Sequence, residues 1–80
     1  MIEEIRNRLS LEKFKITCFS NNIDILNYKK LISIKDDEVV ISSSNKQIFI
    51  SGKNLVIIKL VKDELLIEGT IEEIKWININ

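Results

Sequence analysis

From residue 14 onward the chain alternates apolar and polar residues in short runs, and this period of two limits the possible folds more than any other feature. The first run places Phe14, Ile16 and Cys18 on one side and Lys15 and Thr17 on the other. Successive side chains of a β-strand point to opposite faces, so the alternation predicts strands that each bury one face. Clusters of Asn, Asp, Ser and Gly separate the runs and are typical of tight turns. Connections this short leave no room for crossover helices, which favours antiparallel hairpins.

We therefore expect a mostly β fold, a small antiparallel β meander that folds into a sandwich or roll. The strands fall within residues 14–77, and a chain of 80 residues with 45% apolar content predicts one domain, 1–80, near the lower size limit for a hydrophobic core. Residues 1–10 are the exception, because Ile2, Ile5 and Leu9 recur at helical spacing and predict a short N-terminal helix. A helix this short is unstable in isolation, so we expect it to dock on the sheet or on a partner.

Two-residue turns at 36–37 and 44–45 set the expected register of three strands. They pair Ile34 with Val39, Ile32 with Ile41, Ile41 with Ile48, and Val39 with Ile50. Cross-strand partners share a face, so these pairs predict a buried layer. Residues of the later strands join this layer, and the predicted core comprises Ile34, Val39, Ile41, Ile48, Ile50, Ile57, Leu65 and Ile67. Cys18 is also expected to be buried, as a small apolar side chain in phase with Ile16.

Three residues are candidate structural turns: Gly52 and Asn54, which precede the run 55–61, and Gly69, which precedes the last predicted strand, 71–77. Glycine and asparagine tolerate the positive φ that turns often need, although each glycine also fits a β-bulge that bends a continuous sheet. The Ile-x-Ile-x-Gly segment that ends at Gly52 has an echo 17 residues later, the Leu-x-Ile-x-Gly segment that ends at Gly69. Either a repeated β-roll or two hairpins of similar length produces such an echo.

A second set of apolar residues lies on the opposite, otherwise polar side of the strands. This candidate interface consists of Val40, Phe49, Ile58 and Leu66, and the turn at 44–45 places Val40 directly across from Phe49. Such a belt is covered either by a second layer of the protein itself or by another protein. The chain contains no proline, a residue that often protects sheet edges, so an edge-to-edge homo-oligomer is also accessible.

The sequence lacks the residues that most catalytic and metal sites need. There is no histidine and Cys18 is the single cysteine, which excludes a thiolate zinc site and a histidine-activated nucleophile. The acidic pairs Asp36-Asp37 and Glu72-Glu73 lie in a turn or point to opposite faces of a strand, where carboxylates are normally solvated. The two glycines are too far apart for a phosphate-binding loop. We expect no enzymatic activity, no cofactor and no bound metal.

Charge and hydropathy narrow the expected partners. Twelve basic and twelve acidic residues cancel, so no global field attracts the chain to nucleic acid or to an anionic membrane. Tyr28, Lys29 and Lys30 come nearest to a base-stacking site, which leaves a module for single-stranded nucleic acid as the alternative function. The acidic N-terminus lacks the apolar region of a signal peptide, and no apolar run is long enough to span a bilayer. We expect a cytoplasmic protein that binds other proteins and no nucleic acid.

Five segments in a fixed order carry a family resemblance: Ile16-Thr17, Ile25-Leu26-Asn27-Tyr28-Lys29, Asp37-Glu38-Val39-Val40-Ile41, Ile48-x-Ile50-x-Gly52-x-Asn54-Leu55-x-Ile57, and Leu65-x-Ile67-x-Gly69-x-Ile71-x-x-Ile74. In this order they resemble the YabP/YqfC family of sporulation proteins, and the chain is more similar to the YqfC branch. The chain departs from the family pattern at Lys15, where a proline is common, and at Asn45-Lys46, where a glycine is common.

The resemblance implies a non-catalytic protein made during endospore formation in the mother-cell cytoplasm. Family members are typically encoded beside an integral membrane protein, which implies a membrane-bound protein partner that recruits the chain to a membrane. The resemblance brings no catalytic or cofactor-binding residues with it. The function it implies is that of a protein-interaction or assembly module.

Overall fold

The computed structural model describes residues 13–79, and all regular structure in this part of the chain is β. The helix predicted for residues 1–10 lies outside the described residues. The six strands are β1 (Lys15–Phe19), β2 (Asn22–Leu26), β3 (Lys30–Ile34), β4 (Glu38–Ser42), β5 (Lys46–Val61) and β6 (Glu64–Asn78). All their pairings are antiparallel, which confirms the predicted mostly β, antiparallel class.

The strands form one sheet in the order β1-β2-β6-β5-β4-β3. This order differs from the predicted simple meander, because β2 pairs with β6 and not with the next strand along the chain. The difference arises from the lengths of β5 and β6, which have 16 and 15 residues. These two strands are longer than the strands that flank them, so β4 pairs only with the first half of β5, and β2 pairs only with the first half of β6.

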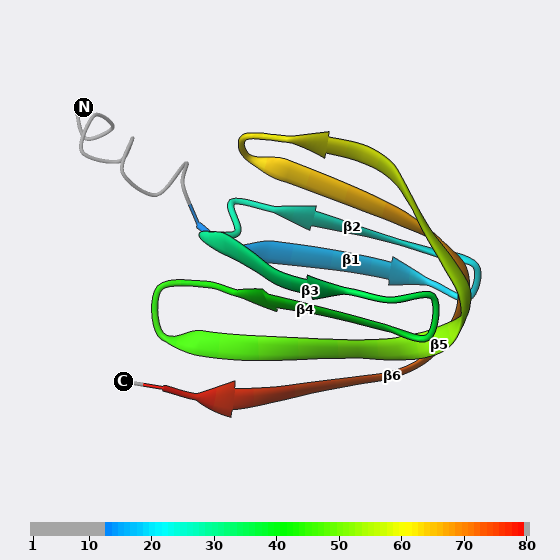
Figure 1. Ribbon diagram of the computed structural model, residues 1–80. Coiled ribbons are helices and arrows are strands. Elements are labelled where there is room, and N and C mark those ends of the chain that lie inside the picture. The colour runs from blue at the N-terminus through cyan, green and yellow to red at the C-terminus, as the bar shows by residue number, and fades with distance from the viewer. Residues whose placement is uncertain (1–12, 80) are drawn as a thin grey trace.

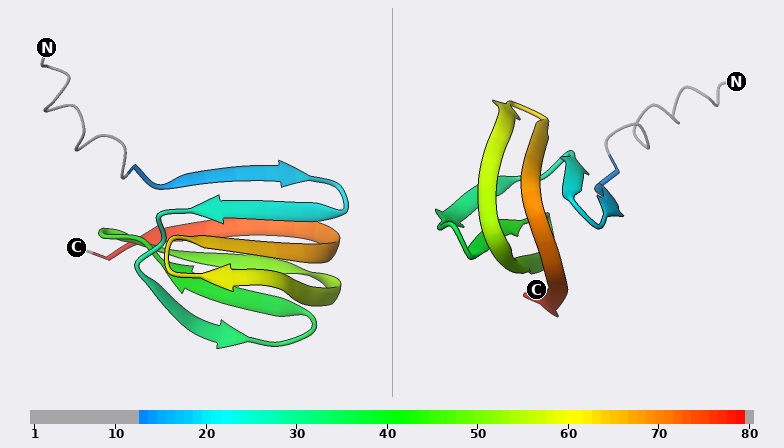
Figure 2. Two further views of the ribbon diagram at one scale, coloured as in Figure 1. Left: turned by 90° about the horizontal axis from the view of Figure 1, so that it is seen from above. Right: turned by 90° about the vertical axis from the view of Figure 1, so that its right-hand side faces the viewer.

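The β5–β6 hairpin bends in its middle and folds the sheet into two layers (Figure 1). The upper layer in that view contains β1, β2, the first half of β6 (64–68) and the second half of β5 (56–61). The lower layer contains β3, β4, the first half of β5 (46–53) and the second half of β6 (70–78). Figure 2 shows β5 and β6 curving together from one layer into the other. The predicted sandwich is therefore formed by a single folded sheet.

Close backbone contacts explain why small residues occupy the bend. A Cβ atom on Gly52 would collide with the carbonyl oxygen of Thr70, and one on Gly69 would lie 2.7 Å from the carbonyl oxygen of Asn54. Gly69 has a φ of +139° and Asn54 a φ of 55°, values that most L-residues avoid. The β5–β6 register also shifts here, as in bulges that bend a sheet. The strands do not end at these residues, so of the two possibilities that the sequence left open, a turn between strands or a bulge that bends a continuous sheet, the structure has the bulge.

Two hairpin turns hold the bend from outside. In the turn between β3 and β4, the carbonyl of Asp37 accepts a hydrogen bond from the N–H of Gly52 (3.0 Å), and that of Asp36 accepts one from Leu55 (2.8 Å). The turn at 20–21, between β1 and β2, accepts two bonds from the bend of β6 in the same way, at 3.1 and 3.2 Å. The backbone donors exposed by the bulges are thus satisfied in both layers.

The two layers are built alike, and this accounts for the 17-residue echo. Ile48 and Ile50 line the core from the first half of β5, while Leu65 and Ile67 line it from the first half of β6. Each strand half then ends at a glycine in the bend. The similar sequence segments that end at Gly52 and Gly69 therefore reflect two equivalent layers, each built around one half of the β5–β6 hairpin, and not a repeated β-roll.

The predicted register of β4 on β5 is confirmed by the pairs Val39–Ile50, Val40–Phe49 and Ile41–Ile48. On β3 the predicted pair Ile34–Val39 is also confirmed. The predicted pair Ile32–Ile41 is wrong, because the register shifts by one residue and Leu31 lies opposite Ile41. Ile32 is the extra residue of this bulge and is 43% exposed.

The core lies between the two layers and consists of Ile23, Ile25, Val39, Ile41, Ile48, Ile50, Leu55, Leu65 and Ile67. Most of the predicted core residues are therefore confirmed, and Ile57 is partly buried against them. The prediction for Ile34 is wrong, since the residue lies at the end of edge strand β3 and is 49% exposed. The prediction for Cys18 is also wrong, since β1 is an edge strand and this thiol is exposed near its end.

Candidate interaction surfaces at the sheet edges

The four residues predicted as an interface do not form one continuous belt. Val40 and Phe49 are cross-strand partners in the lower layer, where Val40 is buried and Phe49 is half-buried. Leu66, which is half-buried, and Ile58, which is 50% exposed, belong to the upper layer. Both layers turn their core residues toward each other, so Phe49 and Leu66 lie on opposite outer surfaces. The structure thus places Val40 beside Phe49 in one layer, and Ile58 and Leu66 in the other layer.

Large apolar residues that remain exposed in the described chain gather on four edge segments. They are Phe19 on β1, Ile32 and Ile34 on β3, Val56, Ile58, Leu60 and Val61 on the second half of β5, and Trp76, Ile77 and Ile79 at or just beyond the end of β6. Within residues 13–79, each of these segments pairs with a strand on one side only. Single exposed apolar residues are common on proteins, whereas a concentration of them along open edges makes these edges candidate contact surfaces.

The second half of β5 has the densest group, and we call residues 56–61 the apolar β5 edge. Val56, Ile58, Leu60 and Val61 are each 50–55% exposed. The β5–β6 register shifts between Ile57 and Lys59, which makes Ile58 an extra residue in a bulge. A bulge interrupts the regular row of backbone groups, so this edge favours contact through side chains over addition of a strand.

A cleft of about 230 Å³ opens between the layers at the opposite side of the sandwich. It is lined by Phe14 and Ile16 from the upper layer and by Lys46 and Trp76 from the lower layer. Trp76 pairs with the core residue Ile48 and therefore belongs to the inner face, yet it is 57% exposed. The sequence did not predict this cleft, because the residues that line it lie in or next to β1, β5 and β6 and meet only when the sheet folds into two layers. The sequence signal for it was that Trp76 is in phase with Ile74, two residues earlier.

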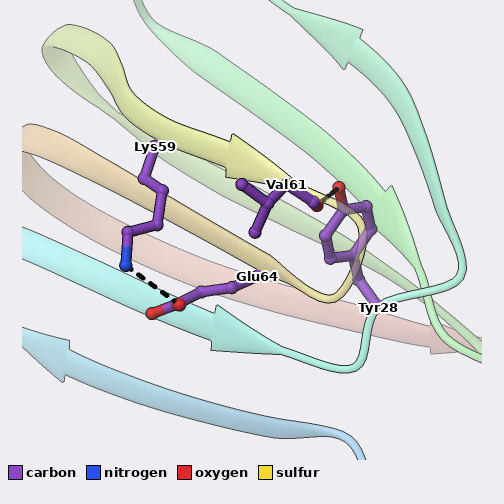
Figure 3. Close-up of polar contacts among 4 residues, drawn as sticks. All are labelled: Tyr28, Lys59, Val61 and Glu64. Carbon is purple, nitrogen blue, oxygen red and sulfur yellow. Dashed lines mark hydrogen bonds and ion pairs between the residues drawn. The ribbon is translucent and has the colours of Figure 1, made fainter.

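A coupled group of charged residues ties three strands together on the outer face of the upper layer. Lys59 Nζ lies 3.2 Å from Glu64 Oε1 (Figure 3). Burial raises the pKa of Asp24 above its ordinary value, and a hydrogen bond to Glu64 raises it further. The same hydrogen bond, together with the one from Lys59, lowers the pKa of Glu64. Asp24 is therefore the carboxyl of this pair that binds a proton more readily, and its Oδ1 has no hydrogen-bond partner.

Tyr28 lies in the connection that carries the chain from the upper layer to the lower one. Its ring packs against the core, and its hydroxyl donates a 2.9 Å hydrogen bond to the carbonyl of Val61 (Figure 3). A ring held in this way is not an open platform for a nucleic-acid base. Of the three residues considered for nucleic-acid binding, Tyr28 thus has a structural role, while Lys29 and Lys30 are exposed.

The two acidic pairs make different contacts, the pair at 36–37 through its backbone carbonyls and the pair at 72–73 through the carboxylate of Glu72. The pair at 36–37 lies in the turn that supports the bend, and Glu72 forms an ion pair with Lys53 at 3.7 Å. Across residues 13–79, no group of three His, Cys, Asp or Glu side chains is placed to hold a metal ion. The same part of the chain has no helix of the length and apolar character needed to cross a membrane.

Comparison with known proteins relates the chain to a family. A family model described as the YabP family matches residues 6–79. The chain is 36% identical over 56 residues to "Uncharacterized protein YqfC" of Bacillus subtilis (strain 168). This match covers 70% of the chain and 60% of that relative, so it spans less than two thirds of the relative's length. No solved structure matches the chain. The chain belongs to the YabP family, and this membership implies a sporulation-related protein.

Proposed function

We propose that the chain is a non-catalytic protein-interaction or assembly module that acts during endospore formation. Its partner in this proposal is an integral membrane protein of the sporulation programme, which recruits the chain from the mother-cell cytoplasm to a membrane. The observation that carries the proposal is the concentration of exposed apolar side chains on the open edges of the two layers.

The apolar β5 edge is the surface that we assign to this partner. Its four half-exposed side chains lie within six successive residues, 56–61. Full burial of one such side chain is worth about 1.5–3 kcal/mol, so covering the exposed half of all four supplies several kcal/mol. The partner surface should therefore be apolar, with polar groups at its rim that match Lys59 and Glu64. The alternative function in nucleic-acid binding gains no support, because the Tyr28 ring is packed against the core.

Affinity capture from sporulating cells tests this assignment. The full chain is tagged and compared with Ile58→Glu, which places a carboxylate at the centre of the apolar β5 edge, where burying an unpaired charge is costly. Ser44→Glu adds the same charge at an exposed turn and is the matched control. We expect the wild-type chain and the control to retain a membrane protein that Ile58→Glu loses, with all three folded by circular dichroism.

Equal recovery with Ile58→Glu and with the wild-type chain would contradict the assignment. Phe49→Glu provides a second arm on the outer surface of the lower layer. Loss of the partner in this variant alone would show that the binding surface lies on the lower layer.

A further inference from the structure

The cleft between the two layers is lined by apolar side chains that the described residues cover only in part. It has a volume of about 230 Å³ and opens where β1 begins and β6 ends, at the same end of the sandwich (Figure 1). Phe14 and Ile16 pack against the core on one side of the cleft, while Trp76 on the other side is 57% exposed. Covering large apolar side chains such as these is favourable, because it removes their surface from water.

The size and lining of the cleft fit one or two aliphatic side chains. An apolar cavity of about 150 Å³ stays dry and holds one benzene molecule, whereas clefts for drug-sized ligands have volumes of about 300–1,000 Å³. One of the lining residues is charged, Lys46, and within residues 13–79 no carboxylate forms an ion pair with its ammonium group. The cleft therefore suits a protein segment that presents aliphatic side chains next to a carboxylate.

Residues 1–12 join the described part of the chain at the rim of this cleft. Lys13 directly precedes the lining residue Phe14, and its carbonyl accepts a 2.7 Å hydrogen bond from Nδ2 of Asn27, which fixes the point where the segment 1–12 begins. Leu9 is four residues before Lys13, and four residues span at most about 14 Å even when fully extended. A side chain on so short a tether has an effective concentration on the order of 1 mM. This favours the chain's own segment over a second copy or a separate partner.

We propose that the cleft binds the segment 1–12 of the same chain, with Ile5 and Leu9 inserted beside Trp76. These two residues are four apart, a spacing that places side chains on one face of a helix. At the same helical spacing Glu12, three residues after Leu9, shares this face and supplies a carboxylate for Lys46. The segment thus carries both the aliphatic side chains and the charge that complement the cleft.

This docking goes beyond the proposed function, because the cleft lies on the side of the sandwich away from the apolar β5 edge. A docked segment covers Trp76 and leaves residues 56–61 open to another protein. Docking is measured on the purified full chain, and partner capture is measured in cells. Either result can therefore fail without the other.

The fluorescence of Trp76, the single tryptophan, tests the docking on the purified full chain. Ile5→Lys and Leu9→Lys each bring a second ammonium group into the apolar cleft beside Lys46, where burying an unpaired charge is costly. We expect both variants to shift the emission to longer wavelength and to increase its quenching by acrylamide, relative to the wild-type chain. Asn7→Lys adds the same charge on the opposite side of the segment at helical spacing, so this matched control should keep the wild-type emission.

NMR provides a second and direct measurement on the wild-type chain. We expect nuclear Overhauser contacts between the indole protons of Trp76 and the methyl groups of Leu9, at every protein concentration. Indole contacts to Phe14 and Ile16 without any to the segment 1–12 would overturn the proposal, and so would a wild-type emission equal to that of Leu9→Lys. A blue shift that appears only as the concentration rises would also overturn it and assign the cleft to a second copy. Circular dichroism of each variant separates loss of docking from loss of the fold.

Discussion

At the scale of single residues, the position of a strand in the sheet decides what its side chains do. Ile41 and Ile34 are both isoleucines in alternating segments, and both lie opposite a residue of the core. Ile41 comes from a strand with neighbours on both sides and is fully buried, whereas Ile34 comes from an edge strand and is 49% exposed. Alternation alone gives the face of a residue but not the depth of its burial.

Truncation of these two isoleucines should therefore have unequal effects on stability. Ile41→Ala removes buried methyl groups between the layers and should lower the free energy of unfolding by about 2–5 kcal/mol. Ile34→Ala is the matched control and should cost less than about 1 kcal/mol, since much of its side chain is already in water. Urea unfolding followed by circular dichroism measures both values. Equal losses for the two variants would contradict the burial that the structure assigns.

The carboxyl pair on β2 and β6 predicts a dependence of stability on pH. Burial raises the pKa of Asp24 in the folded chain, so the folded form binds its proton more tightly than the unfolded form does. Through Asp24 the wild-type chain then gains stability as the pH falls from this raised pKa toward the unfolded value of about 3.9, whereas Glu64, whose pKa is lowered, contributes in the opposite direction. Asp24→Asn removes the charge, keeps a donor for Glu64, and should be more stable than the wild-type chain at pH 7.

This advantage of Asp24→Asn should shrink as the pH is lowered and disappear below about pH 3.9. Thermal unfolding at a series of pH values measures the difference, with Asp63→Asn at the exposed β5–β6 turn as control. A variant that is less stable than the wild-type chain at pH 7 would show that ionised Asp24 stabilises the fold.

At the scale of elements, the bend in β5 and β6 is the feature on which the architecture depends. The sequence locates it, because Gly52, Asn54 and Gly69 are the residues that allow close contact or positive φ. It does not show whether the chain turns back or bends and continues, since both need the same small residues. The hydrogen-bonded pairing of β5 with β6 on either side of the bend shows that both strands continue through it. This pairing joins residues far apart in the sequence. The bulge at Ile32 escaped prediction for the same reason.

Substitution at Gly69 tests the bend directly. In Gly69→Ala the added Cβ would lie 2.7 Å from the carbonyl oxygen of Asn54 at a φ of +139°, and strain of this kind costs on the order of 1–3 kcal/mol. Thr70→Ala changes the exposed neighbour in the same strand and should alter stability by about 0.5 kcal/mol or less. Thermal unfolding compares the two variants. If Gly69→Ala were as stable as Thr70→Ala, the backbone at the bend would have to differ from the structure.

At the scale of the whole molecule, folding one sheet into two layers creates the open edges on which the proposed contacts depend. The alternation of apolar and polar residues was enough to predict the fold class, most of the core and the register of β4 on β5. It was not enough to predict the candidate surfaces, because exposure at an edge depends on which strands end the sheet. Ile58 was named as an interface residue from its phase in the strand, whereas the structure places it in a bulge on an open edge.

We propose that the chain acts in sporulation through contacts at its apolar edges, and the titre of heat-resistant spores tests this proposal most directly. The titre is compared among cells whose single copy encodes the wild-type chain, Ile58→Glu or Ser44→Glu, and cells that lack the gene. We expect Ile58→Glu to lower the titre to that of cells lacking the gene, although the variant is folded, and Ser44→Glu to keep the wild-type titre. A wild-type titre with Ile58→Glu would contradict it.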